Sequence, residues 1–530
     1  MSAHTTQARL EAKAYAAIQR KDWPSAAAAL HELTTLAPDS ARAWIELSYV
    51  ESFRGHYRVA GSAITSAARI PGLAGADLAD VLARLRTFND AGTVRQIART
   101  LMQSSIPDSS LLATCAMHLS NLNDHALALE CARMAVTVDE DGMAPRLARG
   151  QMLSQHGDLA AATADFERCL ARAPALASAW WALSRLRRQT TEHNHVQALR
   201  KLLARHGLSP ADLAYASFAL HKELDDLGDV EGAWAALQHA CTAKRATLKY
   251  AVEDSRMLVD ALVAMPATAP TPPPAADANG RIPIFIVGMH RSGTTLLEQL
   301  LDGSPQVRGV GELYDFTSAM RYATDHHCKG VIDRTIVQRA AAADFAEAGQ
   351  RYLQGMAWRL GDERFFTDKL PSNFLNIGFI CRALPQARIL HMVRDPVETC
   401  FSNLRELFSD ANPYSYDQLE LADFFLQYRR LMAHWHAAYP GRILDVDYAE
   451  LTRDPEAVMR KVAAFCGIDY ADAMRDPRSS TRAVSTASAV QVRDRVVRRE
   501  VPKWAPYAKH LQPLIGALRQ GGVEVPERPA

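Results

Sequence analysis

This sequence of 530 residues has little net charge, no long apolar run and no closely paired cysteines. Its formal charge of +1 argues against a nucleic-acid binder that relies on bulk charge. No apolar run reaches the roughly 18 residues that a membrane span needs. The N-terminal stretch up to Trp23 also lacks the apolar core of a signal peptide. We therefore expect no nucleic-acid partner and no membrane span, and we predict a cytoplasmic location.

The cysteines and histidines give no sign of a metal site. The eight cysteines are scattered along the chain, which indicates neither a zinc site nor a disulfide framework. His434 and His436 flank Trp435 in a helical pattern, and a spacing of two places them on different faces of a helix. We therefore expect reduced thiols and no bound metal.

A change in composition divides the chain. Pro, Ala and Thr crowd residues 265–281, and such a segment can neither bury a core nor sustain a helix. A chain of this length is also too long for one hydrophobic core. We predict a helical domain at residues 8–262, a Pro-rich linker at 263–281 and a second domain at 282–520.

The first half repeats itself. The segments LAPDSARAWIEL and RAPALASAWWAL share a pattern, and their tryptophans, Trp44 and Trp180, lie 136 residues apart, which is four times 34. Pro38, Pro107 and Pro174 fall close to multiples of this period, where one helix must end before the next begins. The period predicts an α-solenoid of helix pairs and resembles the tetratricopeptide repeat family. That resemblance leaves open recruitment of a protein or peptide acceptor, a purely structural role and a homodimer.

The second half mixes strands and helices. IPIFIVGM reads as a buried strand that ends at a glycine turn, and TTLLEQLL reads as the helix that follows. ARILHMVRDP and RILDVDYAEL add two further strands. This alternation predicts an α/β domain of P-loop-like type with a central parallel sheet, whose ligands bind beyond the carboxyl ends of the strands.

The loop after the first strand is nearly a Walker A phosphate loop, but Thr294 stands where that motif has its lysine. Backbone N–H groups at the start of a helix hold an anion whatever the side chains are. Arg291 adds a guanidinium that can grip an oxyanion with two hydrogen bonds. The predicted anion-binding residues are Arg291, Ser292, Gly293, Thr294 and Thr295. Such a loop suits a 5′-phosphate that carries one further group, whereas a small P-loop kinase, the rival interpretation, needs the lysine.

Two segments together resemble sulfotransferases, and in particular the tyrosylprotein sulfotransferases. GMHRSGTTLLEQLLDGSPQVRGVGEL is similar to that family's 5′-phosphosulfate loop, and HMVRDPVETCFSN is similar to its 3′-phosphate segment, with Arg394 and Ser402 in the matching places. The resemblance implies transfer of a sulfuryl group from 3′-phosphoadenosine-5′-phosphosulfate (PAPS) to an acceptor hydroxyl, without a metal. A protein or peptide tyrosine is the expected acceptor, while carbohydrates, lipids and small phenols stay open.

The resemblance also implies catalytic roles. Glu312, in GVGEL, stands at the position of the family's catalytic base, and a base is needed because a phenol, with a pKa of about 10, is protonated at neutral pH. Arg291 and Lys369 would neutralise the departing phosphate, and Ser488 would stabilise the transition state. A scaffold with an inactive domain is the remaining alternative, and the presence of these residues speaks against it.

Two more residues correspond to family residues that contact the sulfate donor, and one position departs from the family pattern. Tyr448 matches a tyrosine near the nucleotide, and Lys503 matches a lysine that contacts the donor's phosphates. The family has an arginine four residues after Ser402, where this chain has Glu406, and Arg405 precedes it. The sequence leaves open whether Arg405 takes over that arginine's role.

Overall fold

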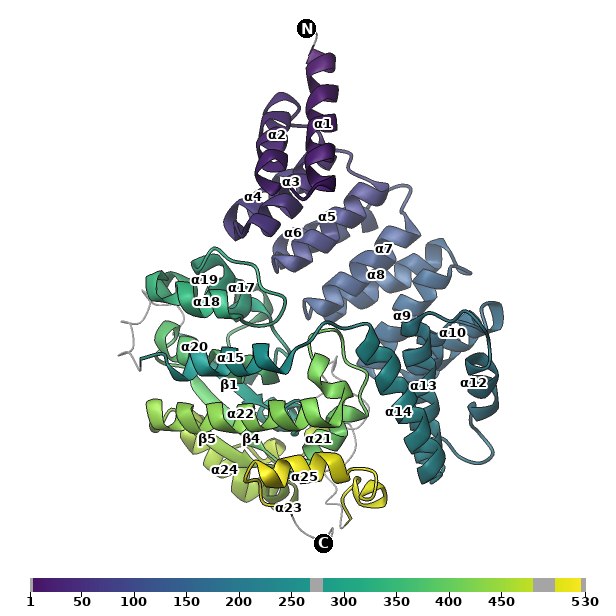
Figure 1. The fold of residues 1–530 in the computed structure, drawn as a ribbon, viewed down its shortest axis with the longest axis vertical. Helices are drawn as coiled ribbons and strands as arrows, with labels where there is room; N and C mark the ends of the chain where they lie inside the picture. The colour runs from purple at the N-terminus through teal and green to yellow at the C-terminus, as the bar shows by residue number, and fades with distance from the viewer. Residues whose placement is uncertain (1–2, 267–279, 480–500, 526–530) are drawn as a thin grey trace. The chain divides into compact units, whose positions relative to one another are not determined.

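The computed structural model describes residues 3–266, 280–479 and 501–525 (Figure 1). The chain forms two compact units, one of Met1–Met152 with Tyr314–Gly355 and one of Leu153–Leu313 with Met356–Ala530. Each unit therefore combines part of the helical half with part of the second half. Most of the predicted linker at 263–281 lies outside the described residues, and the predicted domain boundaries stay a prediction.

The described part of the first half, residues 3–266, is built of helices joined by short connections. Neighbouring helices such as α1 and α2, α3 and α4, and α13 and α14 pack against each other in pairs. The helices are α1 (Ala3–Gln19), α2 (Trp23–Leu36), α3 (Ala41–Arg54), α4 (Tyr57–Ala68), α5 (Gly75–Thr87), α6 (Ala91–Met102), α7 (Ser109–Asn121), α8 (His125–Val138), α9 (Met143–His156), α10 (Leu159–Arg172), α11 (Ala177–Arg185), α12 (Val196–Leu203), α13 (Pro210–Asp226), α14 (Val230–Ala246) and α15 (Val252–Val263).

Aspartates at helix starts show the predicted repeat in the structure. Asp22, Asp90, Asp124 and Asp158 are the N-cap residues of α2, α6, α8 and α10, and each carboxylate accepts a backbone N–H three residues on. Successive members lie 68, 34 and 34 residues apart, all multiples of 34. An N-cap of this kind stabilises a helix by about 1 kcal/mol. The prediction of a solenoid of helix pairs is confirmed.

The second half contains a sheet of five strands, in the order β2-β3-β1-β4-β5. All neighbouring strands are parallel, with Gly288 opposite Met392 and Val393 opposite Asp447. The prediction of an α/β domain with a parallel sheet is therefore confirmed. The strands are β1 (Ile282–Gly288), β2 (Val307–Arg308), β3 (Phe365–Asp368), β4 (Arg388–Val393) and β5 (Ile443–Asp447).

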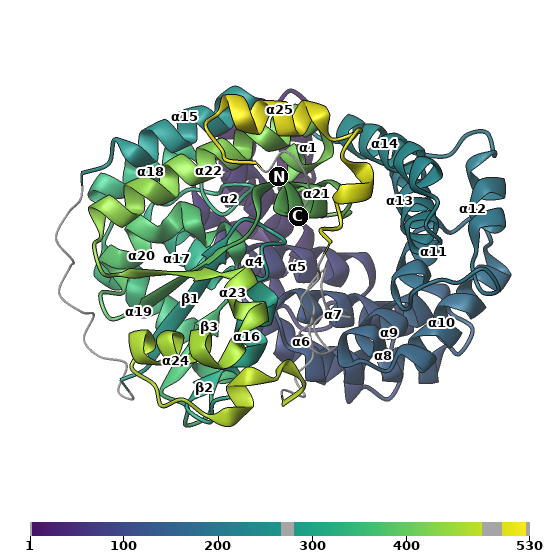
Figure 2. The same ribbon diagram turned by 90° about the horizontal axis from the view of Figure 1, so that it is seen from below.

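Helices cover both faces of this sheet (Figure 2). On one face, Ile284 and Ile286 of β1 belong to a buried cluster with residues of α16 and α24. On the other face, Tyr428 of α22 packs on His391 of β4. The remaining helices are α16 (Thr294–Leu301), α17 (Asp315–Ala323), α18 (Arg334–Arg339), α19 (Phe345–Met356), α20 (Ile377–Ala383), α21 (Pro396–Leu404), α22 (Gln418–Ala438), α23 (Tyr448–Arg453), α24 (Pro455–Cys466) and α25 (Gln512–Gln520).

Within the first unit, the segment 314–355 packs on the early helices. Tyr57 of α4 lies 3.1 Å, hydroxyl to hydroxyl, from Ser318 of α17. The next residue, Arg58, donates its backbone N–H to Asp325 at 2.8 Å. This segment begins at Tyr314, two residues after Glu312 in the sequence. The chain therefore leaves the second unit almost immediately after the predicted base.

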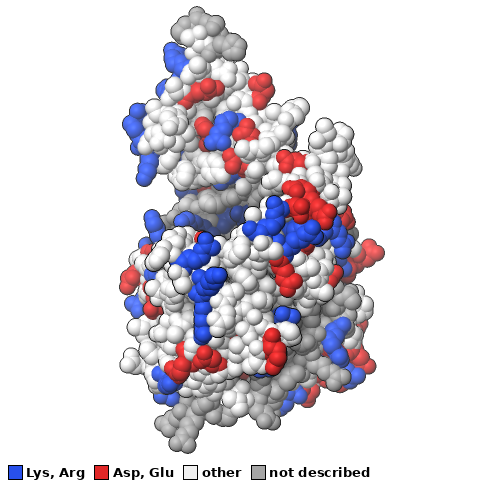
Figure 3. Space-filling model, turned by 90° about the vertical axis from the view of Figure 1, so that its right-hand side faces the viewer, with Lys and Arg blue, Asp and Glu red and all other residues white. Residues whose placement is uncertain are grey.

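Within the second unit, ion pairs join the last repeat helices to α22 and the loop before it. We call these contacts the bridging pairs: Lys244–Asp410, Arg245–Glu420, Arg256–Asp423 and Arg430–Asp260. The face in Figure 3 likewise shows cationic and anionic residues interspersed. All eight cysteines are buried and form no disulfide with one another. Within the described ranges, no helix has the length and apolar character needed to cross a membrane.

Candidate active site

The carboxyl ends of the strands bring the predicted residues to one edge of the sheet. The loop with Arg291 follows β1, Glu312 follows β2, Lys369 follows β3, Arg394 follows β4 and Tyr448 follows β5. Because all the strands are parallel, these ends share an edge. The structure therefore places these residues, which lie up to 157 positions apart in the sequence, around one region.

The loop between β1 and α16 is tightly constrained. A Cβ atom at Gly288 would lie 2.8 Å from the backbone oxygen of Met392, and one at Gly293 would lie 2.5 Å from the ring of Tyr448. Gly293 has φ +110° and Arg291 has φ +67°, a left-handed conformation that is costly for a residue with a side chain. Glycine is required where neighbouring atoms come this close, and the loop is held between β4 and Tyr448.

The start of α16 presents hydrogen-bond donors to the same region. Gly293 is its N-cap residue, and the first turn of a helix leaves backbone N–H groups without intrahelical acceptors. Thr294, Thr295 and Ser292 are buried around it. The buried hydroxyl of Ser292 has no hydrogen-bond partner among the described residues. This set of donors suits an anion.

Lys369 and Glu312 form an ion pair at the ends of β3 and β2. The Lys369 Nζ lies 2.7 Å from a carboxylate oxygen of Glu312. Lys369 is fully buried, whereas the side chain of Glu312 is 36% exposed. The backbone N–H of Lys369 also donates to the Gly311 oxygen at 3.0 Å. A buried ammonium needs such an anion, and Glu312 keeps an exposed side from which a ligand can approach.

Glu298 of α16 has a positioning role that the sequence did not reveal. One of its buried carboxylate oxygens accepts the Gly311 N–H and the Thr367 hydroxyl, each at 2.8 Å. It thus fixes the residue immediately before Glu312 to both α16 and β3. The available signal was that Glu298 is the single charged residue of the helix TTLLEQLL.

His290 is a second residue that the sequence prediction missed, although it lies inside the loop. Its ring nitrogens lie 3.3 Å from the hydroxyls of Ser372 and Tyr414. Burial lowers the pKa of His290 to about 4, and the cations Lys369 and Arg291 lower it further against the opposing effect of Glu312. The imidazole is therefore neutral at physiological pH and adds no charge to the site.

Arg394 supports the loop from β4. It donates to the backbone oxygen of Arg291 at 2.9 Å and to Glu398 at 3.0 Å. Its guanidinium also lies over the ring of Tyr448, at 4.4 Å from the centroid. Ser402 lies two turns further along, on α21, and is buried. The structure thus brings Arg394, the loop and Tyr448 into direct contact.

Arg405, the candidate substitute for the displaced family arginine, is bound elsewhere. Its guanidinium pairs with Asp225 of α13, whose carboxylate also accepts the Tyr507 hydroxyl at 2.6 Å. Burial would raise the pKa of Asp225, but Arg405 and His221 outweigh burial and lower it to about 2. Arg405 therefore sits in an ion pair with the repeat helices.

The last predicted residues lie near the C-terminal end. Ser488 lies outside the described residues, while Lys503 is partly buried beside the buried Trp504. The functional roles of all the predicted site residues stay predictions.

One group of potential metal ligands occurs in the described part of the chain: His391, His436 and Asp445. One Asp445 oxygen lies 2.7 Å from His391 and 2.9 Å from His436, which are hydrogen-bond distances. His436 thus pairs with β5 and not with His434. The expectation of no metal stays a prediction.

Comparison with known proteins places the second half in a family. The sulfotransferase family matches residues 283–472. An uncharacterized protein of Aquifex aeolicus (strain VF5) is 30% identical over 339 residues, which are 62% of this chain and 44% of that protein. Protein-tyrosine sulfotransferase 2 of Gallus gallus is 27% identical over 202 residues, 35% of this chain and 51% of that protein. The chain spans about half the length of these two relatives.

Two solved structures are similar to parts of this chain. The sulfotransferase domain of the Synechococcus PCC 7002 olefin synthase has 20% identity and a TM-score of 0.32, and the match covers 48% of this chain and all of that domain. The TPR protein YrrB has 17% identity and a TM-score of 0.22, and the match covers 42% of this chain and 87% of that protein. With the sequence match at residues 283–472, the C-terminal region of this chain contains a sulfotransferase family domain, which follows a solenoid of helix pairs.

Proposed function

We propose that this chain transfers a sulfuryl group from PAPS to the hydroxyl of a protein or peptide tyrosine. The observation that carries the proposal is the Lys369–Glu312 pair at the sheet edge that also holds the loop of Arg291. Sulfation of a hydroxyl needs a base for the acceptor and cations for the leaving group, and the carboxylate and cationic side chains at this edge support the proposal. The family match supports the reaction class, and the tyrosine sulfotransferase among the relatives supports the acceptor class.

The donor would lie along the loop and the ends of β4 and β5. Arg394 and Ser402 would hold its 3′-phosphate, and Lys503 and Tyr448 would contact the nucleotide. The close packing of Gly293 against Tyr448 keeps the loop in one conformation, so its donors are already arranged for an anion. The residues proposed to hold the 5′-phosphosulfate are Arg291, Ser292, Gly293, Thr294 and Thr295.

In the proposed reaction, Glu312 accepts the proton of the tyrosine hydroxyl as its oxygen bonds to the sulfur of the donor. The bond between that sulfur and the bridging phosphate oxygen breaks, and adenosine 3′,5′-bisphosphate leaves with the electron pair. Lys369 and Arg291 neutralise the charge that develops on the phosphate, and Ser488 assists in the transition state. The exposed side of Glu312 gives the acceptor access, while burial of Lys369 strengthens its effect on the leaving group.

The test is transfer of labelled sulfate from PAPS to tyrosine peptides, with the same peptides carrying phenylalanine as a control. We expect sulfated tyrosine and an equal amount of adenosine 3′,5′-bisphosphate. Arg291→Ala should weaken donor binding, and the exposed Asp362→Asn serves as the matched control. ATP hydrolysis without sulfate transfer would favour a kinase. Tight binding of adenosine 3′,5′-bisphosphate without transfer to any acceptor would favour an inactive scaffold.

Recruitment of the peptide by the solenoid belongs to the same proposal. Helix pairs of this kind form extended surfaces that bind peptides. A peptide with a sequence that the solenoid binds should therefore have a lower KM than a tyrosine peptide without it, at similar kcat. Equal KM values for both peptides would assign the solenoid a structural role.

A further inference from the structure

Glu406 lies between two arginines that come from different halves of the chain. Its carboxylate is 3.9 Å from Arg291 of the loop and 3.4 Å from Arg185 of repeat helix α11. The Glu406 side chain is only 9% exposed, so its charge is weakly screened by solvent. One carboxylate is thus shared by two guanidiniums, and the group of three carries one net positive charge.

Arg185 is held firmly in this place. It is the last residue of α11, and its guanidinium lies over the Trp181 ring, 4.9 Å from the centroid. Trp181 packs on Phe218 of α13, which in turn packs on Tyr416 in the loop before α22. A chain of aromatic contacts therefore connects the end of α11 to the loop that carries Glu406.

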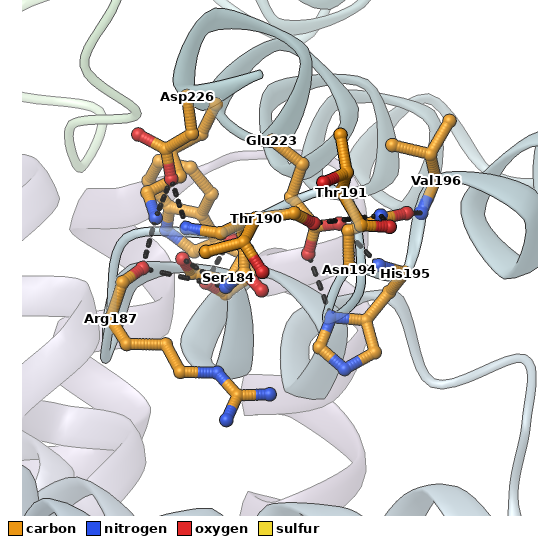
Figure 4. Close-up of polar contacts among 12 residues, drawn as sticks. Ser184, Arg187, Thr190, Thr191, Asn194, His195, Val196, Glu223 and Asp226 are labelled. Atoms are coloured by element: carbon orange, nitrogen blue, oxygen red, sulfur yellow. Dashed lines mark hydrogen bonds and ion pairs between the residues drawn. The ribbon is translucent and has the colours of Figure 1, made fainter.

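The chain that follows α11 is also fastened to α13 (Figure 4). Glu223 accepts the backbone N–H of His195 at 2.5 Å and lies 2.8 Å from its ring nitrogen. Asp226 accepts the backbone N–H of Gln189 at 2.8 Å and an ammonium hydrogen of Lys222 at 2.6 Å. These contacts attach the loop after Arg185 to α13 at two points, Gln189 and His195. The fold of the repeats therefore determines the position of the Arg185 guanidinium.

The other arginines near the loop have carboxylates of their own. Arg394 pairs with Glu398, and Arg405 pairs with Asp225. Arg185 is thus the arginine from the repeats that shares Glu406 with the loop. Without it, Glu406 would be left to pair with Arg291 alone, and a full ion pair would compete with any anion that Arg291 binds.

We propose that Arg185 is a positioning residue of the donor site. By sharing Glu406, it leaves the charge of Arg291 available to the phosphosulfate of the donor, an inference that rests on the proposed function. The repeats then supply part of the electrostatics of the sulfotransferase domain. The chemical class of the ligand is a nucleotide with a terminal phosphate or phosphosulfate.

The test measures the affinity of the full chain for adenosine 3′,5′-bisphosphate by titration calorimetry. We expect Arg185→Ala to weaken binding about tenfold or more, because Glu406 then competes for Arg291. Arg185→Lys keeps the charge and should retain most of the affinity. The decisive variant is R185A/E406Q, in which the competing carboxylate is also gone and wild-type affinity should return. The exposed Arg188→Ala, three residues away, is the matched control and should bind normally.

The outcomes separate this inference from the function on which it rests. Normal binding by Arg185→Ala overturns the inference alone, and so does equally weak binding by R185A and R185A/E406Q, which indicates a merely structural role. A wild-type chain that binds no adenosine 3′,5′-bisphosphate overturns the proposed function and the inference with it. Thermal unfolding of each variant checks folding, and Arg185→Gln, which keeps most of the side chain, replaces Arg185→Ala if the latter unfolds.

Discussion

Two sets of ion pairs in the second unit differ in how deeply their charged groups are buried. The pairs at the sheet edge each contain a buried member: Lys369 with Glu312, and Glu398 with Arg394. Among the bridging pairs, Arg430 and Asp260 are 49% and 57% exposed. Both sets have similar distances, so geometry alone does not distinguish them.

The difference in burial predicts different consequences of mutation. Removing one partner of a buried pair leaves a charge that has lost both water and counter-ion, which costs about 3–5 kcal/mol. An exposed pair exchanges its partner for water, and its loss costs about 1 kcal/mol or less. The edge pairs should therefore govern activity and stability together, and the exposed pair Arg430–Asp260 should govern neither strongly.

The largest effect is expected for Glu312→Ala. Loss of the base should lower kcat by about 10²–10⁴-fold. The variant should also be less stable by about 3 kcal/mol, because Lys369 is left buried without its anion. Lys369→Met should lower kcat by about 10²–10³-fold but cost less stability, because Glu312 can be solvated. Urea unfolding and peptide sulfation measure both quantities, and equal stability losses would contradict the asymmetry.

Glu298→Leu tests the support behind that pair. The variant loses the acceptor of two buried hydrogen bonds, which should cost about 2–3 kcal/mol. Displacement of Gly311 should move Glu312 and lower kcat by about 10²-fold at most. Glu298→Gln keeps a carbonyl oxygen for both donors and is the matched control. If Gln and Leu variants lose the same activity, hydrogen bonding by this residue does not position the base.

Gly293→Ala tests the close contact between the loop and Tyr448. A methyl group at 2.5 Å from the ring, on a backbone with φ +110°, should cost about 2 kcal/mol and weaken donor binding. Tyr448→Ala removes the clash but not the backbone strain. The double variant should therefore be more stable than the sum of the two single losses predicts. Strict additivity in thermal unfolding would show that the two residues do not touch.

The sequence predicted those parts of the site that are local in the chain. The loop from Gly288 to Thr295 and the strand end before Arg394 follow from short patterns, and the structure contains both of them. The ion pair of Arg185 with Glu406 joins residues 221 positions apart and comes from long-range packing that brings the end of α11 to the loop after α21. No local pattern reports such packing, and a 34-residue repeat predicts helix pairs without predicting what they touch.

The burial of individual polar groups could not be predicted from the sequence either. Glu298 and His290 stand in quoted motifs, but only the fold shows that one carboxylate fixes Gly311 and that burial keeps one imidazole neutral. The division into two units was also not predicted, since the insertion after Leu313 packs with α4 through Tyr57. Long-range packing decides these features, and composition and periodicity do not encode it.

The stability of the chain should depend on pH because a histidine of the repeats is buried in the second unit. His221 is 1% exposed, and burial, with a smaller effect of Arg405, lowers its pKa to about 4. The unfolded chain, with a histidine pKa of about 6.5, then binds the proton first. Stability should fall as pH drops from about 6.5 to about 4, by at most about 1.4 kcal/mol per pH unit for this residue. His221→Gln should flatten that slope in urea unfolding, and the exposed His206→Gln should leave it unchanged.

The smallest effect is expected for the exposed bridging pair. Arg430 and Asp260 lie 2.7 Å apart, yet both side chains are about half exposed, so water replaces either partner when it is removed. Arg430→Ala and Asp260→Asn should each change the free energy of unfolding by less than about 1 kcal/mol and leave kcat unchanged. The double-mutant cycle should give a coupling of about 0.2–1 kcal/mol that disappears at high salt. A coupling as large as that of Lys369 with Glu312 would show that burial does not separate the two sets, and the roles of both would have to be assigned on other grounds.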